Sequence, residues 1–148
     1  ASKSNEYSLI VGHSLGGFYV LASQFDIQKL VINPCMFPSV EIPKLDDNHV
    51  VTPELIEKWK MLEEEIYCQI DPETKDLIAG VFGESDPLFS YYEKFQSVYG
   101  KWRAVKVPGE HKFTDEQIKV ALDAGFYGTK PLPGSCEPFS FDGDDVYD

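Results

Sequence analysis

The sequence predicts an α/β fold in which helices cover the faces of a parallel sheet. Short apolar runs of strand length alternate along the chain with segments of helical periodicity, which is the pattern of such sheets. The chain has 148 residues, of which 43% are hydrophobic and 14% aromatic, and this composition suits one domain with a sizeable core. We expect four strands with flanking helices.

The first predicted strand is the apolar run at residues 7–11, which stops abruptly at a serine between two glycines. Gly12, Ser14 and Gly16 have the spacing GxSxG, and a helical segment over residues 15–24 follows. A serine forced into such a strand-to-helix turn has its hydroxyl held out above the sheet. The crowded backbone should leave almost no room for a side chain at either glycine. The segment is therefore predicted to be a nucleophile elbow.

The second predicted strand is residues 30–32, and a long stretch punctuated by prolines follows over residues 35–51. A helix then begins at Pro53, with Thr52 as its N-cap. Its apolar residues recur at helical spacing and its charged residues occupy the opposite face. This pattern predicts either a helix docked on the sheet or core, or a lid over Ser14. The apolar stripe consists of Leu55, Trp59, Leu62 and Ile66, and the charged face of Glu57, Lys58, Glu63 and Glu64.

Two further strands are predicted in the second half of the chain. Residues 77–82 form an apolar run that ends in a turn-rich segment with two carboxylates, Glu84 and Asp86. Residues 103–107 alternate polar and apolar side chains, as a half-buried strand does, and His111 follows shortly after.

The last two predicted helices have recognisable ends. Each begins at a capping box, in which side chain and backbone satisfy each other's donors, and each ends at a glycine. After residue 128 the pattern stops, and we expect residues 129–148 to be an acidic tail, rich in proline and glycine, outside a domain over residues 1–128. The capping boxes are Ser90 with Glu93 and Thr114 with Gln117, and the stops are Gly100 and Gly125.

Three polar residues lie just past predicted strands in the order serine, acid, histidine. Because parallel strands end at one edge of the sheet, Ser14, Asp86 and His111 are predicted to meet there. Ser14 is the candidate nucleophile, His111 the base that takes its proton, and Asp86 the acid that orients the imidazole. The backbone N–H of Leu15, at the start of the helix, would help to hold an oxyanion.

Each role has a rival. Glu84 lies in the same loop as Asp86 and competes for the acid role, since a glutamate can serve. His13 is adjacent to the nucleophile, but its side chain is expected to point away from the serine and to pack the turn. His49 lies in a polar stretch and is expected to be a solvated loop residue, and Glu110 is expected to face solvent.

Several motifs together resemble the YqiA-type small esterases of the α/β-hydrolase superfamily, over nearly all of residues 7–126. The elbow is shared by many hydrolases, whereas Asn33-Pro34 and the His-x-Phe at His111 point to the narrower family. The resemblance implies a serine esterase with Ser14, Asp86 and His111 as its triad. The motifs are residues 10–19, Val31-Ile32-Asn33-Pro34, Gly83-Glu84-Ser85-Asp86, Tyr91-Tyr92 and Pro108-Gly109-Glu110-His111-Lys112-Phe113.

One departure from that family concerns the start of the chain. Family members carry several strands and an oxyanion loop before the elbow, and this chain reaches the elbow almost at once. We therefore expect the C-terminal part of a longer hydrolase fold, or a chain completed by another segment or subunit. In either case the strand before Ser14 should be covered, by the same strand of a second copy, by another chain, or by an upstream segment.

The net charge and the cysteine content of the chain indicate which partners and which compartment to expect. The net charge of −12 disfavours nucleic acid and anionic membranes, and no apolar run is long enough to span a bilayer. The cysteines Cys35, Cys68 and Cys136 are odd in number and widely spaced, so free thiols and a cytoplasmic location are expected. The expected function is hydrolysis of a small-molecule ester or related acyl compound, without metal or organic cofactor. The alternative is a non-catalytic binding or interaction protein of the same fold.

Overall fold

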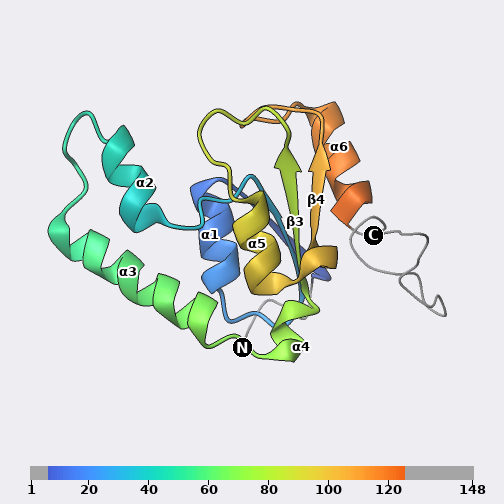
Figure 1. Ribbon diagram of the computed structural model, residues 1–148, viewed down its shortest axis with the longest axis horizontal. Coiled ribbons are helices and arrows are strands. Elements are labelled where there is room, and N and C mark those ends of the chain that lie inside the picture. Colours follow the sequence, from blue (N-terminus) through green and yellow to red (C-terminus); the bar gives the residue numbers. More distant parts are fainter. Residues whose placement is uncertain (1–6, 126–148) are drawn as a thin grey trace.

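The structure of the chain is a computed structural model, and it describes residues 7–125. Four parallel strands form one sheet in the order β1-β2-β3-β4, which confirms the predicted α/β class (Figure 1). Because all three strand pairs are parallel, the carboxyl ends of all four strands lie along one edge. The strands are β1 (Leu9–His13), β2 (Gln28–Ile32), β3 (Ile78–Gly83) and β4 (Ala104–Val107).

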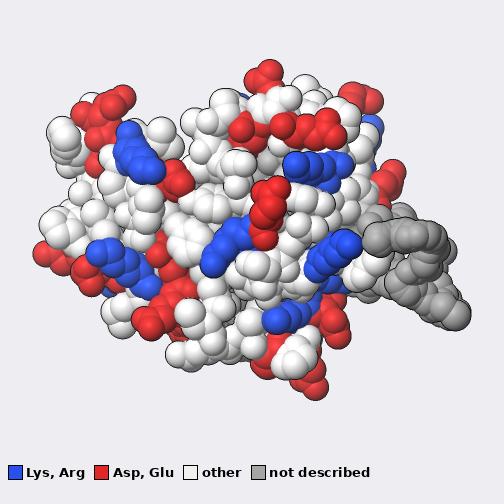
Figure 2. All heavy atoms as spheres, viewed as in Figure 1, with Lys and Arg blue, Asp and Glu red and all other residues white. Residues whose placement is uncertain are grey.

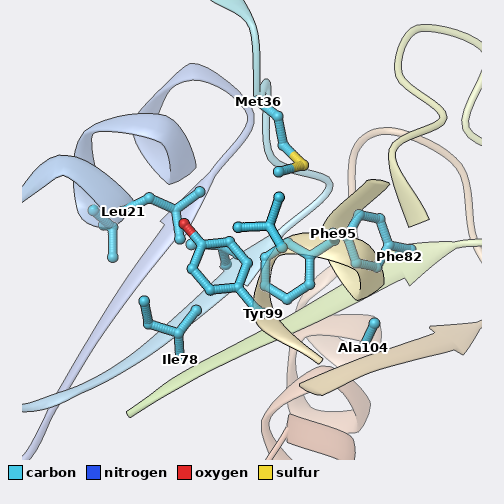
Figure 3. Packing of buried hydrophobic residues seen from close by; sticks show 10 residues of the cluster. Leu21, Met36, Ile78, Phe82, Phe95, Tyr99 and Ala104 are labelled. Atoms are coloured by element: carbon cyan, nitrogen blue, oxygen red, sulfur yellow. The ribbon is translucent and has the colours of Figure 1, made fainter. Parts of the chain in front are cut away.

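Helices cover both faces of the sheet. On one face, α1 and α5 enclose the larger core cluster, in which the rings of Phe95 and Tyr99 lie 4.6 Å apart and close to Met36 (Figure 3). On the other face, Ala121 of α6 packs against β2, β3 and β4. The helices are α1 (Leu15–Ala22), α2 (Pro38–Leu45), α3 (Pro53–Cys68), α4 (Pro72–Lys75), α5 (Tyr92–Tyr99) and α6 (Asp115–Asp123), and a short 3₁₀ helix spans Lys101–Arg103.

Side chains of the central strands alternate between the two cores. In β2, Val31 points to the α1/α5 face whereas Leu30 and Ile32 point to the α6 face. In β3, Ile78 and Phe82 alternate in the same way with Ala79 and Val81. Burial on both faces is the property that makes parallel strands read as continuous apolar runs in the sequence.

Of the three predicted helix N-caps, two are confirmed and one is wrong. Thr52 accepts a hydrogen bond from the Leu55 N–H, and Thr114 forms both bonds of its capping box, as predicted. The capping box at Ser90 is wrong, because α5 begins one residue later and its N-cap, Tyr91, makes no side-chain capping bond.

Two helices were not predicted. No helix is predicted in the proline-punctuated stretch over residues 35–51, but Pro38 occupies the first turn of α2, where its missing N–H is not needed. Pro43 lies inside the same helix, which therefore does without one backbone bond. The second is the single turn α4, which Asp71 caps by accepting from the Thr74 N–H.

Helix α3 docks on the rest of the protein through its apolar stripe, in agreement with the first of the two interpretations. Trp59 is buried, and its Nε1–H donates to the Tyr19 hydroxyl of α1 at 2.9 Å. The prediction that Glu63 lies on the solvated face is wrong. Its carboxylate is buried and accepts from the Ser39 N–H at 2.9 Å and from the Ser39 hydroxyl at 2.8 Å, because α2 covers this side of α3.

Replacing Glu63 by alanine should therefore destabilise the fold by about 1–3 kcal/mol, the cost of leaving buried donors unpaired. Glu63→Gln should cost less, since its amide can still accept from the Ser39 N–H and donate to the hydroxyl. The neighbouring exposed residue supplies a matched control, and Glu64→Ala should change the free energy of unfolding little. Urea unfolding of the three variants checks this order, which a loss in Glu64→Ala equal to that in Glu63→Ala would contradict.

The remaining predictions about surface and termini are only partly tested. Within the described residues, β1 is an edge strand that pairs with β2, and Val11 is 42% exposed, so the predicted cover for this strand stays a prediction. Figure 2 shows basic side chains interspersed among acidic ones over the face in view. Among residues 7–125, no helix is long and apolar enough to cross a bilayer. The predicted tail at 129–148 and Cys136 lie outside the described residues.

Candidate active site

Ser14 lies in a sharp turn between β1 and α1. Its backbone has φ 58° and ψ −125°, a conformation that residues other than glycine rarely adopt. The turn closes because Gly12 has no side chain: a Cβ there would lie 2.6 Å from the Gly16 carbonyl oxygen and from Val20. The expectation for Gly16 itself is wrong, because a Cβ at that position would meet no described atom within 4 Å.

The main chain of Ser14 is fixed on both sides by the last residue of β2 and by the segment that follows it. Its N–H donates to the Ile32 carbonyl at 3.1 Å, and its carbonyl accepts from the Cys35 N–H at 2.9 Å. The same carbonyl accepts from two N–H groups in the first turn of α1. The strained turn is thus held by neighbouring backbone rather than by its own preference.

The side chains of Ser14, His111 and Asp86 form a continuous chain of hydrogen bonds. His111 Nε2 lies 2.9 Å from Ser14 Oγ, and His111 Nδ1 lies 2.9 Å from Asp86 Oδ2. The side chains of Asp86 and His111 are 3% and 13% exposed, so water has little access to the pair. Because a carboxylate only accepts, Nδ1 carries the proton of that bond, and Nε2 is left to accept from the serine hydroxyl.

Asp86 is fixed in its loop by its second oxygen. Oδ1 accepts from the Leu88 N–H at 2.8 Å and from the Phe89 N–H at 3.2 Å, so the other oxygen is directed at His111. Phe89 also places its ring edge-on to the imidazole, with centroids 5.0 Å apart. The rival Glu84 is exposed, and its N–H pairs with the Val107 carbonyl. The structure therefore brings Asp86, and not Glu84, to the histidine.

The other two histidines are not members of this hydrogen-bonded chain. His13 follows β1 directly before Ser14, and its exposed side chain reaches the loop of His111. Its Nε2–H donates to the His111 carbonyl at 2.7 Å, and the two rings are 4.8 Å apart. His49 is exposed in its loop, as is Glu110, in agreement with the expectation for both.

Asn33 joins the site although sequence reasoning gave it no role there. Its amide nitrogen donates to the carbonyls of Glu110 and His111, at 2.9 Å each, and its oxygen accepts from the Gly83 N–H at 2.8 Å. The residue is 1% exposed and has φ 44°. A polar residue tolerant of positive φ, directly after a buried strand and before a proline, is the signal that could have drawn attention to it.

The start of α1 faces the same edge of the sheet. Leu15 is the first residue of this helix, so its N–H has no acceptor within the helix. A helix N-terminus favours negative charge, and this N–H adjoins the Ser14 hydroxyl in the chain. The position fits one donor of an oxyanion site.

Cys35 is the other nucleophilic side chain near Ser14. It is fully buried, and burial, together with the nearby carboxylates of Glu41 and Glu63, raises the pKa of its thiol to about 12. The thiol therefore stays protonated near neutral pH and is a poor nucleophile. Cys35 and Cys68 are both free. Within residues 7–125, no three His, Cys, Asp or Glu side chains gather into a group that could hold a metal ion.

Comparison with models of protein families gives a match over most of the chain. A family model described as "Uncharacterised protein family (UPF0227)" matches residues 1–121, which include Ser14, Asn33, Asp86 and His111. No curated protein matches the chain.

Proposed function

This chain belongs to the uncharacterised protein family UPF0227, and we propose that it is a serine hydrolase of the α/β-hydrolase superfamily that cleaves small carboxylic esters or related acyl compounds. The observation that carries the proposal is the hydrogen-bonded chain from Ser14 through His111 to Asp86, with both distances at 2.9 Å. Its position agrees with the proposal, because open α/β sheets bind ligands at the carboxyl ends of their strands.

The proposed reaction begins when Ser14 Oγ attacks the ester carbonyl. His111 Nε2 takes the hydroxyl proton as the C–O bond forms, and Asp86 stabilises the resulting imidazolium. The oxyanion is held by the Leu15 N–H at the start of α1. His111 then gives its proton to the departing alcohol, and an acyl-enzyme on Ser14 remains.

The second half of the reaction reverses these roles. Water replaces the alcohol and loses its proton to His111 Nε2 as its oxygen attacks the acyl carbon. Collapse of the second tetrahedral intermediate breaks the bond to Ser14 Oγ, which recovers its proton from His111. The products are a carboxylic acid and an alcohol, and no metal or organic cofactor enters these steps.

The proposal is tested with a fluorophosphonate probe and with p-nitrophenyl esters of graded acyl length. A serine activated by its histidine attacks phosphorus, so peptide mass spectrometry should place the label on Ser14. The esters should be hydrolysed, and the preferred chain length would indicate the acyl class. Folded protein that takes no label and cleaves no ester would reject the hydrolase proposal and favour a non-catalytic binding protein of this fold.

The acid role yields a prediction of its own. Asp86→Asn keeps Oδ1 for the Leu88 and Phe89 N–H groups but turns an amide toward His111, which favours the wrong tautomer. We expect kcat to fall by about 10⁴-fold, as for the same change in other triads. Glu84→Gln is the matched control and should keep its activity, since that side chain is exposed. The reverse order in ester hydrolysis would move the acid role to Glu84.

A further inference from the structure

The side chain of Asn33 lies where three segments of the candidate site meet. It follows β2, the strand between β1, which leads to Ser14, and β3, which leads to Asp86. Its amide nitrogen binds the carbonyls of Glu110 and His111, which lie 77 and 78 positions further along the chain. One side chain thus touches the loop of the base and the strand end before the acid.

The hydrogen-bonding capacity of Asn33 is matched to these neighbours. Both hydrogens of the amide point at main-chain carbonyls, those of Glu110 and His111, and the amide oxygen accepts from the Gly83 N–H. An amide can donate and accept at once, and aspartate of the same shape cannot when it is ionised. Asn33 is 1% exposed, so water has little access to its side chain.

The same short segment also holds the nucleophile. Ile32 and Cys35, which flank Asn33-Pro34, bind the N–H and the carbonyl of Ser14. A Cβ at Gly17 in α1 would come within 3.1 Å of Pro34, so the helix after Ser14 also rests on this segment. Residues 32–35 are therefore in contact with the backbones of Ser14 and His111 simultaneously.

The loop at residues 108–111, which carries His111, also packs closely against the end of β3. A Cβ on Gly83 would lie 2.6 Å from the carbonyl oxygens of Gly109 and Glu110, so β3 and this loop are in close contact. The Ser85 N–H donates to the Gly109 carbonyl at 2.9 Å. Asn33 closes this arrangement by fixing the carbonyl of His111 itself.

We infer that Asn33 is a positioning residue, whose carboxamide sets the distance and angle between His111 and Ser14. The inference rests on the proposed function, because it concerns how efficiently His111 takes the serine proton. Asn33 does not touch the reacting atoms. Its effect passes through the backbone of residues 110–111.

Two variants test the carboxamide while respecting the positive φ. Asn33→Asp keeps the shape but replaces the donor by an oxygen that faces two carbonyl oxygens, and Asn33→Gly removes the side chain without backbone strain. In both, we expect the saturating rate of fluorophosphonate labelling at Ser14 to fall by about 10²-fold, the scale reported for small misplacements of reacting groups. The probe concentration at half saturation should change little.

Arg103→Met is the matched control. Arg103 also clamps two main-chain carbonyls, those of Ile78 at 2.7 Å and Asp76 at 3.1 Å, but at the opposite end of β3. Its loss should lower the unfolding temperature and leave the saturating labelling rate unchanged. The His111 Nδ1–H resonance in proton NMR gives a second readout, and it should move or broaden in both Asn33 variants and stay in place in Arg103→Met.

Three results would overturn the inference: wild-type labelling rates in the Asn33 variants, an equal rate loss in Arg103→Met, or loss of the native fold in both Asn33 variants while Arg103→Met stays folded. Failure of the proposed function looks different, because then the wild-type chain takes no label. In that case the NMR resonance alone decides whether Asn33 positions His111.

Discussion

Replacing Ser14 by alanine should lower kcat for ester hydrolysis by about 10⁶-fold, the loss that follows removal of the serine from such a triad. The reason is that alanine offers no oxygen to form the acyl-enzyme, whereas His111 and Asp86 keep their places. Because triad members act as a unit, the remaining imidazole should recover little of the loss. Initial rates with the best p-nitrophenyl ester, measured down to the uncatalysed background, check this.

The matched control is Ser23, which caps the C-terminal end of α1, whereas Ser14 precedes its first residue. Ser23 donates its hydroxyl to the Val20 carbonyl at 2.8 Å, far from His111, so Ser23→Ala should keep its activity. Thermal unfolding of both variants shows whether each keeps its fold. A folded Ser14→Ala protein with wild-type ester hydrolysis would mean that another group carries the activity and that the elbow serine does not.

The elements that bear the candidate triad could be predicted because their signals are local. The elbow can be recognised from the spacing of Gly12, Ser14 and Gly16 alone. Strands buried on both faces can be recognised as apolar runs. Since parallel strands end at one edge, the loops after the strands that lead to Asp86 and His111 had to lie near Ser14. The structure brings these three side chains together.

The contacts that were missed depend on neighbours distant in the sequence. Asn33 and His13 both bind the His111 carbonyl, and that contact exists only once the loop at residues 108–111 has folded over the end of β2. Helical spacing placed Glu63 on the charged face, and the unpredicted α2 then covered that face. One missed helix therefore produced a second error in burial.

His111→Ala should lower kcat for ester hydrolysis by about 10⁶-fold as well, because the serine then lacks a base and the leaving alcohol lacks an acid. His13→Ala should lose far less. Although its ring lies 4.8 Å from that of His111, its exposed Nε2–H reaches only the His111 carbonyl. The buried Asn33 amide holds that carbonyl together with the Glu110 carbonyl and the Gly83 N–H, so the loop depends less on His13 than on Asn33. Steady-state rates of the two variants against the same ester separate the two histidines.

His13→Ala and His111→Ala remove the same type of side chain from neighbouring positions in the structure. A difference in activity between them therefore reflects the position of the histidine rather than the residue type. The probe adds a second measure: Ser14 should be labelled at a nearly normal rate in His13→Ala and barely at all in His111→Ala. A large loss in His13→Ala with little in His111→Ala would transfer the base role to His13. It would also require Ser14 to turn its hydroxyl away from the histidine that now lies 2.9 Å from it.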